Sequence, residues 1–152
     1  MHFYFLLAES NGGGGITYDP VGFSAHSQVD AYYEEFSPIR FGGVITNIGN
    51  RYYVDNSTFV CPYDGVYLFS IAILGDHRYR SDYQLLLDGG LIATVFLDSS
   101  SVGTYPTGAT VVVIECNAGS SVYVRSGDDA AWMMGGYERH SVFSGYMLYP
   151  YL

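Results

Sequence analysis

The chain has 152 residues, a length that fits one domain with a real core, and 49% of its residues are hydrophobic while only 14% are charged. This balance excludes intrinsic disorder, which requires low hydrophobicity and high charge. The net charge is −9 and the chain has no lysine, so we expect no nucleic-acid partner, because phosphates require a basic face. No apolar run reaches the roughly 18 residues that a membrane-spanning segment needs, and we expect no membrane span.

Residues 1–20 are predicted to lie outside the packed domain, as an N-terminal tail or extra strand with a glycine-rich linker. Phe3–Ala8 is apolar but spans only six residues, which is shorter than the hydrophobic region of a signal peptide. The run Gly12–Gly15 has the composition of a flexible linker. We therefore expect the globular domain to occupy residues 21–152.

The first strong strand signals lie in the middle of the chain. Gly65–Leu74 is a nearly continuous apolar run with β-branched and aromatic residues, which predicts a central strand buried on both faces. The pair Asp88-Gly89 stands between Tyr83–Leu87 and Leu91–Leu97, and an Asp-Gly pair between two such runs indicates a β-hairpin.

Three more strands are predicted in the C-terminal part. Ala109–Cys116 is a second apolar run that we interpret as a buried strand, Ser121–Arg125 alternates, and Ser141–Tyr149 forms the last strand before Pro150. No stretch shows helical spacing over three turns. Many short strands with turns between them predict an all-β sandwich or jelly roll.

The residues expected of an enzyme are missing. Without lysine there is no Schiff base and no phosphate-binding loop of the Gly-Lys-Ser/Thr type. The four histidines are scattered, and no Gly-x-Ser-x-Gly motif is present for a serine hydrolase. The carboxylate pairs Glu34-Glu35 and Asp128-Asp129 are adjacent in sequence, so on a strand they point to opposite sides. We expect no catalytic activity.

A series of short motifs resembles the globular C1q domain. It covers about Val21 to Leu152 in the right order and spacing, and taken together the motifs are specific. The matching motifs are Gly22-Phe23-Ser24-Ala25, Val44-Ile45-Thr46-Asn47, Phe59-Val60-Cys61-Pro62, Gly65-Val66-Tyr67-Leu68-Phe69-Ser70, Ala118-Gly119 with Val122-Tyr123-Val124, and Ser141-Val142-Phe143-Ser144-Gly145-Tyr146-Met147-Leu148-Tyr149-Pro150.

The resemblance implies a fold, an assembly and a role. The fold is a ten-stranded jelly-roll sandwich of two antiparallel sheets, shared with tumour-necrosis-factor-like proteins, and the assembly is a secreted homotrimer that binds ligands. Gly119-Ser120-Ser121-Val122-Tyr123 departs from the Gly-Asp-x-Val-Trp that the family commonly has. No collagen-like Gly-X-Y repeat precedes the domain in this sequence, and the resemblance is therefore to the stalkless C1q-domain lectins of invertebrates.

Several aromatic residues are candidates for the trimer interface. A 152-residue monomer with 16 Tyr and 9 Phe is expected to expose some of this apolar surface, and such patches usually mark an interface. The alternative is that the rings fill the sandwich core. The alternation of side chains along a strand does not show whether a ring faces the core or a second subunit. The candidates are Tyr67, Phe69, Phe143, Tyr146 and Tyr149.

The resemblance also bears on cysteine pairing and on calcium. In the family's jelly roll the strand ending near Cys116 runs beside the strand that begins at Gly65, which brings Cys116 towards Cys61 and implies a disulfide; two buried free thiols are the alternative. Some C1q-like trimers hold calcium through loop aspartates. Asp98 matches one of these positions, but the second falls near Thr104, so calcium is a possible cofactor with an incomplete ligand set.

Two loops carry unusual chemistry for ligand binding. One contains Arg78, Tyr79 and Arg80, and the other contains the only tryptophan. An aromatic ring can stack on a sugar ring while charged groups bind its hydroxyls. The predicted ligand-binding residues are Arg78, Tyr79, Arg80, Asp128, Asp129, Trp132, Tyr137 and Arg139.

The sequence thus predicts a secreted, homotrimeric C1q-domain protein that binds carbohydrates or other microbial surface patterns without chemistry. The arginines are expected to hold acidic sugars, because a guanidinium binds a carboxylate with two hydrogen bonds. The alternative hypothesis is a trimeric protein of the extracellular matrix or of a mineral surface, for which the acidic charge would serve as the binding feature.

Overall fold

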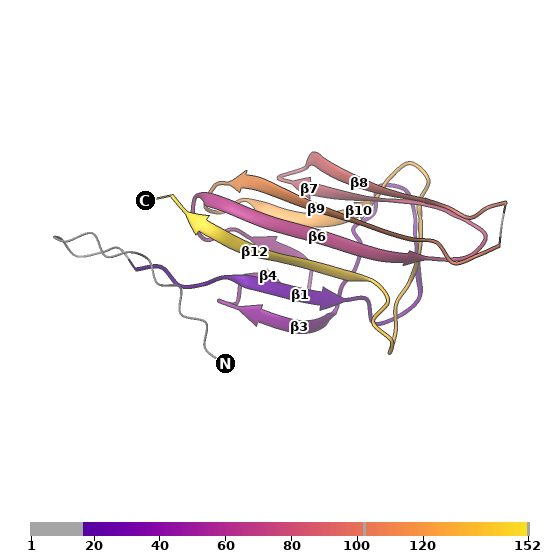
Figure 1. Ribbon diagram of the computed structural model, residues 1–152, viewed down its shortest axis with the longest axis horizontal. Helices are drawn as coiled ribbons and strands as arrows, with labels where there is room; N and C mark the ends of the chain where they lie inside the picture. Colours follow the sequence, from indigo (N-terminus) through magenta and orange to yellow (C-terminus); the bar gives the residue numbers. More distant parts are fainter. Residues whose placement is uncertain (1–16, 102, 152) are drawn as a thin grey trace.

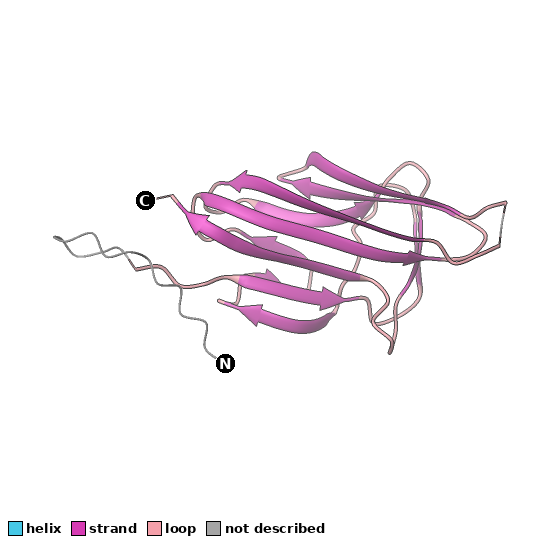
Figure 2. Cartoon of the chain, viewed as in Figure 1, coloured by secondary structure: helices cyan, strands magenta, loops and turns pink. Residues whose placement is uncertain are grey.

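The structure is a computed structural model that describes residues 17–101 and 103–151. These residues form strands, turns and loops with no helix, as Figure 2 shows, and therefore no helix that could cross a membrane. Of the predicted tail, residues 1–16 lie outside the described part. Residues 17–20 precede the first strand, and the Tyr18 ring packs edge-on against Tyr63 at a centroid distance of 6.3 Å. The division of the chain at residue 20 stays a prediction.

Two antiparallel sheets pack face to face (Figure 1), which confirms the predicted jelly-roll sandwich. The larger sheet has seven strands in the order β2-β11-β6-β12-β1-β3, and β9 pairs with the other edge of β6. Its strands are β1 (Gly22–His26), β2 (Ala31–Tyr33), β3 (Gly43–Ile48), β6 (Gly65–Gly75), β9 (Thr107–Cys116), β11 (Ala131–Met134) and β12 (Val142–Pro150).

The smaller sheet has five strands in the order β4-β5-β10-β7-β8. They are β4 (Tyr52–Tyr53), β5 (Thr58–Val60), β7 (Arg80–Leu87), β8 (Gly90–Asp98) and β10 (Ser121–Ser126). The described residues thus form twelve strands where ten were expected. Among them, β2 and β11 are two short strands that pair with each other and extend the larger sheet at one end of β6.

The predicted hairpin forms as expected. Leu87 pairs with Gly90, which leaves Asp88 and Gly89 as the two turn residues, with φ of 48° and 81°. Positive φ at both central positions is the geometry of a type I′ turn, whose twist matches that of the flanking strands. Aspartate is one of the residues that tolerate positive φ, and Asp88 Oδ1 also accepts a hydrogen bond from the Ser121 amide of the neighbouring strand at 2.8 Å.

The core between the sheets is largely aromatic. Phe23 of β1 stacks on Tyr52 at 4.7 Å and on Phe59 at 5.0 Å, and meets Phe143 edge-on at 4.8 Å. Tyr67, Phe69 and Phe143 are 0% exposed. These three residues belong to the core and offer no surface to a second subunit, which corrects their prediction as interface residues. Side chains of odd-numbered residues in β6 face inward because a strand alternates its faces.

The outward face of the larger sheet is a different surface. One row of paired residues crosses five strands of it: Ile48, Gly22, Tyr146, Leu68 and Val113. Ile48 is 52% exposed, Tyr146 44% and Val113 59%. Strand β9, predicted to be buried, therefore exposes every second side chain, because it forms the edge of the sheet and nothing described covers its outward face.

Candidate ligand-binding site

The two loops with unusual chemistry converge on one aromatic cluster. Trp132 of β11 stacks on Tyr79 at a centroid distance of 4.2 Å and an interplanar angle of 12°. A third ring, Tyr32 of β2, meets Trp132 at 4.3 Å and 42° because the two residues are paired across the strands. Tyr32 was not predicted from the sequence. We call Tyr32, Tyr79 and Trp132 the aromatic cluster.

Backbone hydrogen bonds hold Trp132 in place. Its amide donates to Ser81 Oγ at 2.9 Å, and its carbonyl oxygen accepts from the Asp76 amide at 3.0 Å and from the Tyr83 hydroxyl at 2.9 Å. Burial raises the pKa of the Tyr83 phenol, which therefore stays a proton donor at neutral pH. The strand that carries the tryptophan is thus attached to both sheets.

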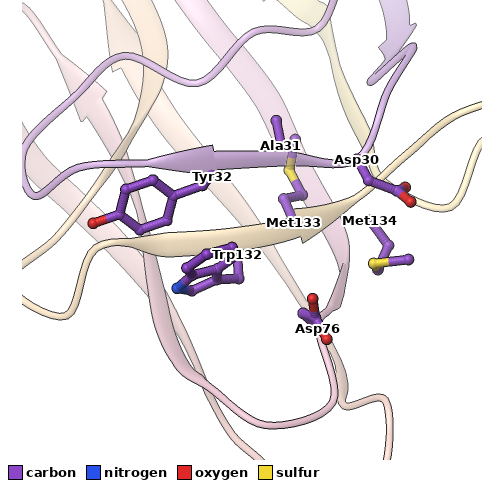
Figure 3. Close-up of a pocket in the computed structure, with 7 residues that line it drawn as sticks. All are labelled: Asp30, Ala31, Tyr32, Asp76, Trp132, Met133 and Met134. Atoms are coloured by element: carbon purple, nitrogen blue, oxygen red, sulfur yellow. The ribbon is translucent and has the colours of Figure 1, made fainter.

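A pocket of about 140 Å³ lies beside the cluster, between β2, β11 and the loop after β6. Its walls include the carboxylates Asp30 and Asp76, the rings of Tyr32 and Trp132, and the side chains of Met133 and Met134. Figure 3 shows Tyr32 within β2 and Asp30 just before this strand, and the Trp132 and Met134 side chains on the side of β11 that faces the Asp76 loop.

The two carboxylates of the pocket differ in their contacts. Asp30 Oδ1 accepts a hydrogen bond from the Gly135 amide at 2.9 Å. Asp76 Oδ1 is buried and has no hydrogen-bond partner within the described residues. The His77 Nδ1 atom lies 2.8 Å from it, within ion-pair distance, but the angles at this contact are not those of a hydrogen bond. Asp76 Oδ1 and His77 Nδ1 are therefore each other's close polar contact.

The arginines expected to bind acidic sugars do not point into this pocket. The Arg78 guanidinium lies 5.7 Å from the centroid of the Tyr79 ring, at the outer side of the aromatic cluster. Arg80 starts β7 and faces away from its neighbour Ser81, as strand alternation requires, so its guanidinium lies over Phe96 at 5.5 Å. The two arginines therefore do not form one carboxylate-binding fork.

Asp98 is the residue that the resemblance connects with calcium. Its Oδ1 accepts hydrogen bonds from the amide and the hydroxyl of Ser100, and these bonds lower the pKa of the Asp98 carboxyl. Its Oδ2 lies 3.9 Å from Arg80 Nε. Across residues 17–101 and 103–151, no three acidic, histidine or cysteine side chains gather into a possible metal site.

The remaining predicted ligand-binding residues lie at the two ends of β11. Asp128 and Asp129 occupy the turn before the strand, where the Asp129 amide donates to Asp82 Oδ1 at 3.2 Å. Tyr137 and Arg139 occupy the turn after it, where Arg139 adopts a φ of 56° and Tyr137 is 97% exposed. The predicted single site is therefore divided, with only Tyr79, Trp132 and Arg78 brought into contact.

The two cysteines lie together at the other end of the sandwich. Cys116 pairs with Gly65, and Cys61 accepts a hydrogen bond from the Gly119 amide at 2.7 Å, which places both sulfurs in the core. Both are free thiols in the structure, and a disulfide between them stays a prediction. A hydrogen bond between the thiols and burial raise the pKa of Cys61, so it packs there as a protonated, small apolar group.

Tyr32 and Asp30 could have been suspected from the sequence only in part. Tyr32-Tyr33 is a tandem aromatic pair, but β2 has three residues and shows no alternation long enough to identify a strand. Its partner β11 is equally short. The pairing that creates the site joins residues about 100 positions apart, and local pattern carries no information on such a contact.

The comparison with family models decides the identity of the domain. Residues 22–148 match the model described as the C1q domain, which is most of the chain. The chain belongs to the C1q domain family. This family is non-catalytic, which confirms that no catalytic activity was to be expected of the domain. Members of the wider C1q and tumour-necrosis-factor group are typically trimeric, and C1q/TNF-related proteins are typically secreted.

Two curated relatives of this C1q domain are complement C1q tumor necrosis factor-related protein 3 of Mus musculus and of Homo sapiens. Each is 29% identical over 113 residues, which is 74% of this chain and 45% of the relative. The chain thus spans less than half the length of the curated relatives that it matches.

Solved structures support the same fold. The globular domain of zebrafish complement 1qA superposes with a TM-score of 0.72 at 16% identity, covering 86% of this chain and 99% of that one. Eiger TNF of S. frugiperda gives 0.69 at 11% identity, with 89% and 96% covered. Murine APRIL gives 0.69 at 10% identity, with 85% and 99% covered. At these identities the likeness concerns the fold alone.

Proposed function

We propose that this chain is a secreted, homotrimeric C1q-domain recognition protein of the stalkless lectin type, which binds carbohydrates of microbial surfaces without chemistry. The observation that carries the ligand class is the aromatic cluster beside the pocket. Tyr32 is 50% exposed and stands next to two carboxylates, so an apolar ring face and polar oxygens are offered together. A pyranose presents the complementary surface, with an apolar face and hydroxyls at its rim.

The trimer is supported by the outward face of the larger sheet. The row from Ile48 to Val113 crosses five neighbouring strands, and its residues Ile48, Tyr146 and Val113 have exposed apolar side chains. Tyr146 pairs with Gly22, where an added Cβ would lie 3.0 Å from the Tyr146 Cβ, so this position leaves no room for a second side chain. Contiguous exposed apolar surface of this kind is rare on monomers and usually marks an interface. Of the predicted interface residues, Tyr146 and Tyr149 stay as candidates.

Three copies would strengthen weak sugar binding. A single small site gives low affinity, but three sites on one trimer bind a repeated surface pattern together if their spacing matches that of the target. Microbial polysaccharides repeat the same sugar unit, which is the pattern that such a trimer would detect.

A glycan array probed with the full chain tests the proposal. We expect the wild type to bind a defined set of saccharides and Tyr32→Ala to lose at least about tenfold of that binding, since stacking on an aromatic ring is removed. Tyr53→Ala is the matched control, because Tyr53 is a similarly exposed tyrosine (46%) on β4, away from the pocket. Light scattering should give a mass near three times 16.7 kDa for all three proteins.

Two results would count against the lectin. Saccharide binding that Tyr32→Ala and Tyr53→Ala leave equally unchanged would remove the aromatic cluster from the site. Absence of any saccharide binding, with attachment to a mineral surface instead, would support the alternative of a matrix or biomineral protein, which the net charge of −9 would serve.

A further inference from the structure

The turn between β4 and β5 contains an acceptor sequence for N-linked glycosylation. In Asn56-Ser57-Thr58 a hydroxyl residue stands two positions after the asparagine, and none of the other four asparagines of the chain is followed in this way. Asn56 is exposed and lies in a four-residue turn of the smaller sheet, at residues 54–57. An oligosaccharide on its side chain therefore has room outside the folded domain.

Hydrogen bonds of the neighbouring residues fix the shape of this turn. Ser57 is 1% exposed, its Oγ accepts from the Phe41 amide at 2.9 Å, and its own amide donates to the Val54 carbonyl oxygen at 3.3 Å. Thr58 Oγ1 donates to the Asn56 carbonyl oxygen at 3.1 Å. The middle residue of the acceptor sequence is thus anchored in the domain, while the asparagine stays at the surface.

An exposed aromatic ring lies beside the acceptor. Tyr53 pairs with Thr58 across the hairpin, so the ring and the last residue of the acceptor sequence are neighbours on the same face of the sheet. Tyr53 is 46% exposed, and Val54, which follows it, is 42% exposed. An aromatic ring can cover the apolar face of a sugar, and the first sugar on Asn56 therefore has a packing partner within the same hairpin.

We propose that Asn56 carries an N-linked oligosaccharide and that its first sugar packs against the Tyr53 ring. The donor is a polyprenyl diphosphate-linked oligosaccharide of the secretory pathway. Asn56 Nδ2 forms a bond to the anomeric carbon of the first sugar and gives up one proton, while the bond from that carbon to the diphosphate oxygen breaks and the lipid diphosphate leaves. The inference rests on the proposed secretion of the chain, because this donor is presented in that pathway.

Translation of the full chain in the presence of microsomes tests the acceptor. A cleavable leader directs each protein into the microsomes, so the result does not depend on how the natural chain is secreted. We expect the wild type to gain one oligosaccharide that peptide N-glycosidase removes, and Asn56→Gln and Thr58→Ala to gain none. Asn117→Gln is the matched control, because Asn117 is an exposed loop asparagine outside an acceptor sequence, and it should be modified like the wild type.

Urea unfolding tests the contact with Tyr53. The glycoprotein is trimmed enzymatically to its first sugar and compared with the unmodified chain. We expect the sugar to raise the folding equilibrium constant about three- to tenfold, as contact with one aromatic ring predicts, and Tyr53→Ala to abolish this gain. Tyr105→Ala is the control, because Tyr105 is a similarly exposed tyrosine (52%) in the loop before β9, and it should retain the gain.

The outcomes separate this inference from the proposed function. A leader-directed wild type without an oligosaccharide, or equal loss of modification in Asn56→Gln and Asn117→Gln, would overturn the site, and the glycan array would still decide the lectin. A sugar that leaves stability unchanged, or stabilises Tyr53→Ala as much as the wild type, would reject the ring contact. Retention of the natural protein inside cells would count against the proposed secretion and against modification of the natural chain together.

Discussion

The molecule contains two groups of stacked aromatic rings that differ in how they are enclosed. In the core, Phe23 and Phe143 are 2% and 0% exposed, and rings surround them on several sides. In the aromatic cluster at the end of β11, Tyr32 is 50% exposed, and a pocket with two carboxylates opens beside it. Ring separations are similar in both places, 4.2 to 5.0 Å.

Stacking alone therefore does not distinguish a core from a binding site. Core rings stabilise the fold because both of their faces and their edges are removed from water. The rings of the aromatic cluster are only partly buried. They therefore contribute less to stability, and part of their surface stays accessible to a ligand. The face of the strand decides the role, since Ala131 and Met133 of β11 are buried whereas Trp132 between them points to the other side.

The largest expected effect follows from enclosure. Phe143→Ala removes a fully buried ring that contacts three others, and we expect it to destabilise the chain by about 3–5 kcal/mol. Tyr32→Ala removes a half-exposed ring with one stacking partner, and its cost should be about 1 kcal/mol. Urea unfolding followed by circular dichroism measures both. Similar costs for the two variants would remove the distinction between core and cluster.

A second, smaller effect concerns the outward face of the larger sheet, where apolar side chains are exposed without a pocket. Val113→Asp places a charge in the row that we assign to the trimer, so association should weaken at least about tenfold, or by ~1.4 kcal/mol. Thr94→Asp is the control, because Thr94 is an exposed strand residue of the smaller sheet. Light scattering over a dilution series should show dissociation for Val113→Asp only. A monomeric wild type at micromolar concentration would refute the trimer.

Much of the fold was predictable because its strands are long enough to show a pattern. Gly65–Leu74 and the Asp88-Gly89 turn carry their conformation in local sequence, through apolar run length and through the demand for positive φ. The order of the motifs then identified the family. The number of strands was less accessible, because β2 and β11 have three and four residues and are defined only by each other.

The sequence indicated the chemistry of the candidate site but not which residues form it. The sequence drew attention to Tyr79 and Trp132 as unusual loop aromatics, and the fold stacks them on each other. The sequence did not show that Arg78 and Arg80 contact different rings. Two residues that are two positions apart, at the boundary of a loop and a strand, can have the same partner or different partners. Nor could the sequence assign Phe143 to the core and Tyr146 to the surface before the sheet pairing was known, because pleat parity has to be anchored by a partner strand.

The smallest expected effect lies where the core meets the cluster, at Asp82. This residue is 9% exposed and its Oδ1 accepts from the Asp129 amide at 3.2 Å, in the turn that leads into β11. Burial, with added repulsion from Asp129, raises the pKa of the Asp82 carboxyl above its ordinary value. An acid whose pKa is raised on folding binds its proton more tightly in the native state, so the native state loses stability as pH rises from about 4 through the raised pKa.

Asp82→Asn keeps the oxygen that accepts from Asp129 but cannot ionise, so it should lack this loss. We expect its free energy of unfolding, relative to the wild type, to be more favourable at pH 7 than at pH 4, by no more than about 1 kcal/mol. Urea unfolding of both proteins at the two pH values gives the difference directly, and comparison with the wild type cancels the other carboxylates. Asp55→Asn, at an exposed aspartate outside this turn, is the control for removing one carboxylate. If the stability of Asp82→Asn relative to the wild type were instead greater at pH 4 than at pH 7, the turn would stabilise the charged form of Asp82. The carboxylate would then contribute to the stability of the native state.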